Sequence, residues 1–218
     1  MKKGLSKKNK AIIAIVFVIL IIGFGIFAWW KAKEKPKTPD EVFDSVLASF
    51  NSKDPKSFEN VYQISDIGEQ ALPRLTSMIE SNSIYERWVA IVCLSTLLRN
   101  NQDLKDQIIP ELEKALDDKN DYLKMLSAAE LCSFGEIKGL PVLITSLKSD
   151  EISIFSDPPS PVSLRANMHL EQYTGKDFDY EYDDKDKRED AVEGWEGWWK
   201  KNKDSLVWDG EKGLFEVK

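Results

Sequence analysis

The middle of the chain repeats itself, and this repeat limits the fold more than any other feature. When Pro73, Pro110 and Pro141 are aligned, an apolar residue precedes each proline, and leucine or isoleucine recurs two and six positions later. Within one unit these residues are three and four positions apart, which places them on one face of a helix. The three rows are Leu72, Ile109 and Leu140; Leu75, Leu112 and Leu143; and Ile79, Leu116 and Leu147.

A second helix in each unit matches as well. Small residues align first, followed by leucines and then by larger apolar residues, in the rows Ala90, Ser127 and Ala166; Leu94, Leu131 and Leu170; and Leu97, Phe134 and Tyr173. The first period is 37 residues, and two helices in each unit are typical of a stacked α-solenoid. We therefore predict an all-α fold with about three helical-hairpin repeats over residues 69–175.

A unit of this kind cannot bury its apolar face alone, so both ends of the stack need caps. Residues 38–68 are expected to form N-terminal capping helices. Residues 176–218 are expected to form a closing loop, a Trp-rich cap helix and a small β-hairpin around "LVWDGEKGLFEV". Trp195, Trp198 and Trp199 have the spacing of one helix face, which favours burial on the last repeat; an exposed sugar- or peptide-binding platform is the alternative.

The segments "ALPRLTSMI…ERWVAIVCLSTL", "IIPELEKAL…YLKMLSAAELCSFG" and "GLPVLITSL…SLRANMHLEQYTG" resemble HEAT repeats of the short bacterial kind related to the HEAT-like repeats of phycobilisome lyases. "TGKDFDY" and "AVEGWEGWWKKN" resemble the closing segment of such proteins, so the similarity covers about residues 65–203. A basic residue early in the second helix is present as Arg87 and Lys124 but is replaced by Ser163. The resemblance implies a binding or scaffolding role. A role as a chaperone for a bilin is suggested by the resemblance only and by no other feature of the sequence.

An uncharged apolar segment occupies residues 11–30, between a basic tail at 1–10 and a charged tether at 31–37. Twenty residues span about 30 Å as a helix, which matches the apolar core of a bilayer. Trp29 and Trp30 end the segment where aromatic rings favour the lipid–water boundary. We predict an uncleaved transmembrane anchor; a signal peptide cleaved after Gly25 is the alternative.

Charge is unevenly distributed along the chain. Residues 1–37 carry nine lysines and one glutamate; subtracting them from 30 basic and 37 acidic residues leaves 21 and 36, a net charge of −15 for residues 38–218. A body so acidic repels phosphate, so we expect no nucleic-acid partner. One more lysine precedes the apolar segment than follows it, which favours a cytoplasmic N-terminus and an extracytoplasmic C-terminal domain at the cell membrane.

Few residues could support catalysis. His169 is the only histidine, and no nucleophile motif, phosphate loop or zinc-protease pattern accompanies it. Cys93 and Cys132 occupy non-equivalent repeat positions, which favours two buried thiols over a disulfide. We predict a non-catalytic protein without cofactor or metal that binds a protein partner at the bacterial envelope. An envelope enzyme, or a subunit of one, acting on cell-wall glycan or peptide is the alternative.

The stretch "LEQYTGKDFDYEYDDKD" alternates acids with aromatic residues. A calcium loop beginning at Asp177 would need glycine at position six and an acid at position twelve, where Tyr182 and Arg188 stand. We therefore expect a closing loop in which Phe178 and Tyr180 pack over the end of the repeats.

The third unit contains eight extra residues, which form a loop at 150–162. Apolar residues followed by prolines are typical of a stiff exposed segment that anchors a partner. The candidate partner-binding residues are Ile152, Ile154, Phe155, Pro158 and Pro159. The alternative is that Ile154 and Phe155 fold back onto the third unit.

Overall fold

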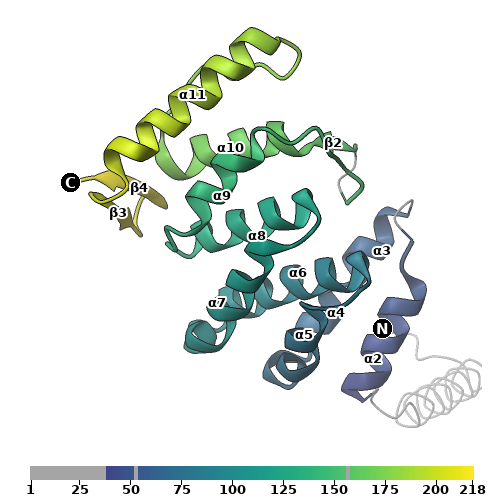
Figure 1. The fold of residues 1–218 in the computed structure, drawn as a ribbon. Helices are drawn as coiled ribbons and strands as arrows, with labels where there is room; N and C mark the ends of the chain where they lie inside the picture. The colour runs from purple at the N-terminus through teal and green to yellow at the C-terminus, as the bar shows by residue number, and fades with distance from the viewer. Residues whose placement is uncertain (1–37, 52–53, 156–157) are drawn as a thin grey trace, which may run out of the picture. The chain divides into compact units, whose positions relative to one another are not determined.

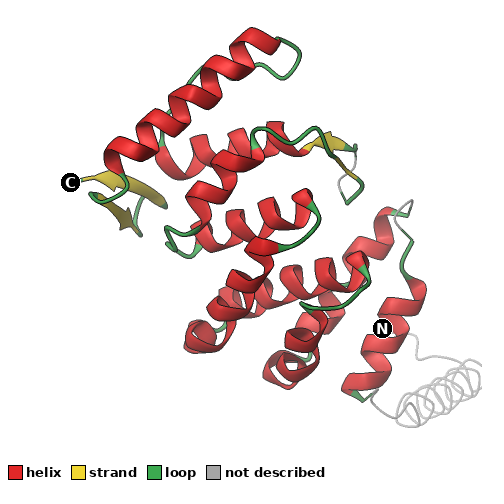
Figure 2. Ribbon diagram, viewed as in Figure 1, coloured by secondary structure: helices red, strands yellow, loops and turns green. Residues whose placement is uncertain are grey.

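The computed structural model describes residues 38–218, apart from 52–53 and 156–157. This part of the chain is mostly helical, as the sequence predicts, and carries two small two-stranded sheets (Figures 1 and 2). The α-helices are α2 (Pro39–Ser49), α3 (Pro55–Asn60), α4 (Tyr62–Ser65), α5 (Leu72–Met78), α6 (Ile84–Asn100), α7 (Lys105–Lys114), α8 (Asp121–Ser133), α9 (Gly139–Ser146), α10 (Val162–Thr174) and α11 (Lys185–Asn202). The strands are β1 (Ile152–Ser153), β2 (Ser160–Pro161), β3 (Leu206–Asp209) and β4 (Leu214–Val217).

Helices that follow one another along the chain pack as pairs. Helix α5 packs on α6, α7 on α8 and α9 on α10, while α8 also contacts both α6 and α10 (Figure 1). The repeated apolar rows lie at these contacts, because every member is buried except the half-buried Leu116 and Phe134. The hydroxyl of Ser127, in a row of small residues, donates a hydrogen bond of 2.6 Å to the carbonyl of Leu112.

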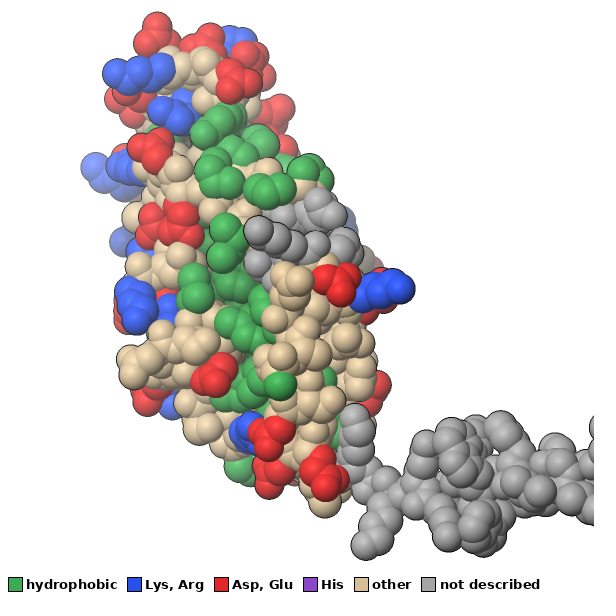
Figure 3. Space-filling view, turned by 90° about the vertical axis from the view of Figure 1, so that its right-hand side faces the viewer, with side chains coloured by type: hydrophobic (Ala, Val, Ile, Leu, Met, Phe, Trp, Pro, Cys, Tyr) green, Lys and Arg blue, Asp and Glu red, His purple; other side chains and the backbone are tan. Residues whose placement is uncertain are grey.

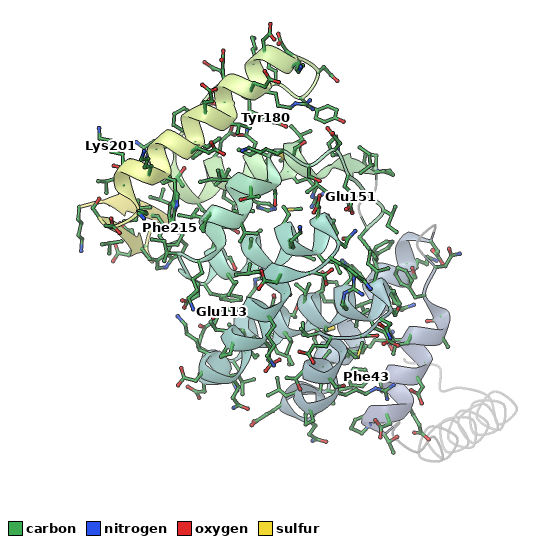
Figure 4. The ribbon with its side chains drawn as sticks, in the orientation of Figure 1. Phe43, Glu113, Glu151, Tyr180, Lys201 and Phe215 are labelled. Atoms are coloured by element: carbon green, nitrogen blue, oxygen red, sulfur yellow. The ribbon has the colours of Figure 1, made fainter. Side chains whose placement is uncertain are left out.

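Polar contacts join the turn of one helix pair to the turn of the next. The buried guanidinium of Arg87 donates two hydrogen bonds, of 2.6 and 3.0 Å, to the carboxylate of Asp118. In the following pair Glu151 accepts from the side chain of Asn120 and from the backbone N–H of Asp121 (Figure 4). The contact in the second pair is therefore made by an acidic residue, Glu151. Ser163, which stands where the repeat pattern has a basic residue, is buried.

The C-terminal segment packs on α9 and α10. Gly175 ends α10 in a left-handed conformation, as a glycine C-cap does. Trp195 of α11 is fully buried, and its indole N–H donates a 3.0 Å hydrogen bond to Asn167 of α10. Phe178 meets the Trp195 ring edge-on at 4.7 Å, and Tyr180 is also buried. Trp195 is therefore buried as expected, whereas Trp198 and Trp199 are half-buried, and Phe178 and Tyr180 pack onto the folded domain.

The predicted C-terminal hairpin is confirmed. Strands β3 and β4 pair antiparallel, with Trp208 opposite Phe215, whose side chain is 2% exposed. Trp208 packs against Gly135, where a Cβ atom would lie 2.7 Å from the indole. The loop after α8 therefore needs glycine both for this close approach and for its φ of 79°.

The predicted transmembrane segment, residues 11–30, lies outside the described residues. Among the helices of residues 38–218, none combines the length and the apolar character that crossing a membrane requires.

Candidate protein-binding surface

The inserted loop forms a short β-hairpin, in which Ile152 pairs with Pro161 and Ser153 with Ser160. Its outward-facing side chains are apolar: Ile152 is 45% exposed and Ile154 57% exposed. Pro158 and Pro159 are exposed as well. Four of the five predicted partner-binding residues are therefore accessible.

Phe155 is different, and the prediction that it is exposed is wrong. Its side chain is 8% exposed and packs against aromatic rings of α6 and α8. The ring of Trp88 is 5.2 Å away and that of Tyr122 is 5.7 Å away, both nearly parallel to Phe155. Burying this ring removes a large apolar surface from water, so Phe155 fixes the hairpin to the domain. Only half of the fold-back alternative is correct, because Ile154 stays exposed.

The aromatic packing under the hairpin extends toward the N-terminal helices. Trp88 also contacts Phe50, Phe58 and Tyr85, with centroids 5.8, 5.3 and 5.9 Å away. Figure 3 views the side that carries the β1–β2 hairpin in Figure 1 and shows hydrophobic side chains running in a band between charged ones. The hairpin thus projects from a continuous aromatic support.

Helix α10 presents a second group of side chains, two exposed and two half-buried, beside the hairpin. Arg165, Met168, His169 and Gln172 are spaced as one helix face, and Met168 is 60% exposed. Arg165 places its guanidinium 5.9 Å from the centroid of the Tyr122 ring, which Phe155 covers as well. The sequence prediction missed this face, which lies beside the predicted buried row of Ala166, Leu170 and Tyr173.

His169 is poorly suited to act as a base. Burial, and then the nearby Arg165 guanidinium, lowers the pKa of His169 to about 4. Its ring lies 6.0 Å from that of Tyr173 in a nearly parallel arrangement, and its Nδ1 atom is buried without a hydrogen-bond partner. At neutral pH this imidazole is therefore uncharged and barely basic.

The two cysteines are both buried and unpaired, as the sequence favours. Burial raises the pKa of Cys93 to about 12 and raises that of Cys132 as well, so neither forms a thiolate at neutral pH. In the acidic stretch, Asp177 accepts from the backbone N–H of Asp179, and Asp184 caps α11. In the described part of the chain, no group of three or more His, Cys, Asp or Glu side chains is placed to hold a metal ion.

The sequence matches no model of a known protein family and no curated protein sequence. The resemblance to HEAT repeats therefore stays a prediction, and the function must be argued from the surface around the β1–β2 hairpin.

Proposed function

We propose that this protein is a membrane-anchored, non-catalytic adaptor that binds a protein partner at the bacterial cell envelope. Residues 11–30 would hold it in the cytoplasmic membrane with the N-terminus inside and the folded domain outside. An anchor raises the local concentration of the domain near partners in the same membrane.

In this proposal the folded domain is a short HEAT-like α-solenoid. Its support is the agreement between the repeated sequence rows and their burial, together with the packing of α6 on α8 and of α8 on α10. Successive helical hairpins that contact only their neighbours are the defining feature of a solenoid.

The observation that carries the proposal is the exposure of Ile152 and Ile154 beside the buried Phe155. Because the buried Phe155 ring holds the neighbouring backbone on the domain, less conformational freedom is lost when a partner covers the isoleucines, so more of the binding energy is retained. The low basicity of His169 supports a role in binding over one in acid–base catalysis.

Photocrosslinking in growing cells tests the proposal. A benzophenone amino acid placed at Ile154 in the full chain should give one reproducible protein adduct. The same amino acid at Val207, which is exposed on the other hairpin, should not give this adduct. Combining Ile152→Ser with a label at Pro158 should abolish the adduct that a label at Pro158 alone gives.

Point substitutions are preferable here to deletion of the loop, because deletion would also remove the buried ring of Phe155. If the labels at Ile154 and Val207 give the same adducts, or if none forms, a role for the hairpin in partner binding is refuted.

A further inference from the structure

Arg165 differs from the other arginines of the chain. There are five, and four of them pair with carboxylates: Arg74 with Asp40 and Asp44, Arg87 with Asp118, Arg99 with Glu130, and Arg188 with Asp150. Arg165 makes no ion pair with any residue that the structure describes, although residues 38–218 carry a net charge of −15. A guanidinium without a carboxylate partner among the described residues is free to pair with an anion from another molecule.

The neighbours of Arg165 hold its side chain in place but leave part of its hydrogen-bonding capacity unused. Its guanidinium lies over the Tyr122 ring, and its Nε atom is buried without a hydrogen-bond partner. One turn further along α10, Nδ1 of His169 is also buried without a partner. Glu130 of the neighbouring α8 is already paired with Arg99. Arg165 and His169, on one helix face, thus each carry one buried polar atom without a hydrogen-bond partner.

The apolar side chains near this face indicate which kind of side chain would flank an anionic group of the partner. Of the six large hydrophobic side chains exposed in the described part of the chain, three lie on α10 or on the hairpin that leads into it: Ile152, Ile154 and Met168. Ile154 directly precedes Phe155, whose ring packs on the same Tyr122 that Arg165 covers. Apolar and cationic contacts therefore occur side by side.

We propose that Ile154, Arg165, Met168 and His169, which we call the α10 strip, bind a segment of the partner in which one carboxylate is flanked by apolar side chains. The inference rests on the proposed function and specifies the chemistry of the partner. Charge complementarity selects the anion, because Arg165 is the arginine without a carboxylate partner among the described residues.

A carboxylate fits this strip better than a phosphate. The planar guanidinium matches a carboxylate with two parallel hydrogen bonds. A dianionic phosphate would meet twice the repulsion from the acidic domain, while one guanidinium and a neutral imidazole offer a single positive charge. The apolar flanks would cover Met168 and Ile154 and exclude water from the ion pair.

The test uses the full chain in detergent, purified without a histidine tag and labelled with ¹⁵N in histidine. His169 is the only histidine, so its imidazole signals report on this strip alone. The probes are the capped peptide acetyl-Leu-Leu-Glu-Leu-amide and its twin with Gln in place of Glu. We expect the Glu peptide to shift the His169 signals and to bind at least tenfold more tightly than the Gln peptide.

Arg165→Gln should remove this difference, and Arg165→Lys should reduce it, since lysine keeps the charge but not the planar fork. Arg188→Gln is the matched control and should change nothing, because Arg188 lies in another ion pair. Unchanged melting temperatures would show that the variants fold. Equal affinity for both peptides, or a preference that survives Arg165→Gln, overturns the inference. Displacement of the Glu peptide by less inorganic phosphate than acetate overturns the choice of carboxylate.

The crosslinking assay separates the two proposals. If Ile154→Ser abolishes the adduct formed at Pro158 while Arg165→Gln leaves it unchanged, the adaptor role stands and the carboxylate contact is refuted. If neither substitution affects the adduct, both proposals fail.

Discussion

At the residue scale, Arg87 shows what the turns between the helix pairs require. Its side chain and that of Asp118 are 5% and 4% exposed. Nη1 donates as well, to the carbonyls of Ser81 and Asn82. A buried ion pair of this kind adds little over an apolar replacement of both partners, but breaking it is costly.

We therefore predict that Arg87→Met lowers the free energy of unfolding by about 3–5 kcal/mol, since the carboxylate of Asp118 is left buried and unpaired. Urea denaturation of the full chain in detergent measures the change. Lys138→Met is the control: Lys138 pairs with Glu113 at the surface, with 63% of its own side chain exposed, and should cost less than about 1 kcal/mol. Similar losses of unfolding free energy in the two variants would contradict the presence of a buried ion pair between Arg87 and Asp118.

His169 should make the stability of the domain depend on pH. Because its pKa is about 4 in the folded chain and about 6.5 when unfolded, the unfolded state binds a proton first as the pH falls. The stability that His169 contributes is complete above pH ~6.5 and is lost as the pH approaches 4.

Replacing His169 by Gln should make the melting temperature less dependent on pH between those values, and the difference should correspond to a free energy on the order of 3 kcal/mol. Carboxylates that titrate in this range affect both proteins equally, so the comparison isolates the imidazole. Parallel curves for the two proteins would mean that His169 titrates normally in the folded state.

At the scale of elements, the β1–β2 hairpin combines a buried residue with exposed ones. Phe155→Ala should lower the free energy of unfolding by about 3–5 kcal/mol, because a buried ring that stacks on Trp88 and on Tyr122 is lost from the core. Ile154→Ala, one residue away, should change it by less than about 0.5 kcal/mol. Chemical denaturation of both variants checks this contrast, and a large loss for Ile154→Ala would mean that its side chain is buried.

The closing loop should stabilise the cap without calcium. Phe178 packs on Trp195, and it occupies the space beside Gly194, where a Cβ atom would lie 2.6 Å from its ring. Because Phe178 is half-buried, Phe178→Ala should cost about 2 kcal/mol, or roughly 5 °C in melting temperature. Added calcium should not restore the loss in a thermal scan. A rise that depends on calcium would show that Asp177 and its neighbours bind the ion.

These elements also show how far the sequence alone could lead. The buried rows around Leu75, Leu94 and their equivalents were predictable, because helical periodicity and a 37-residue repeat both specify them. The burial of Phe155 was not, because it depends on Trp88 and Tyr122, which lie far away in the sequence. The pairing of Arg87 with Asp118 could not be found for the same reason. Arg165 was overlooked because its lack of a partner becomes visible only when all the other pairs are known.

At the scale of the whole molecule, the proposed anchor would hold the acidic domain at the cell membrane. If residues 11–30 remain as a transmembrane helix, the protein isolated from membranes has the full mass of 24.9 kDa and resists extraction by alkaline carbonate. Cleavage after Gly25 would instead leave a shorter, soluble chain. Intact-mass measurement of the washed membrane fraction therefore distinguishes the two.

Orientation and anchoring can be tested in the same cells. Arginine at both Val16 and Ile19 should release the protein from the membrane, since each charge at the centre of a span costs about 2.5–3.5 kcal/mol. Protease added to intact spheroplasts should degrade the domain if residues 38–218 lie outside. Protection of the domain until the spheroplasts are lysed would place it in the cytoplasm. The partner that presents a carboxylate to Arg165 would then have to be sought on the inner side of the membrane.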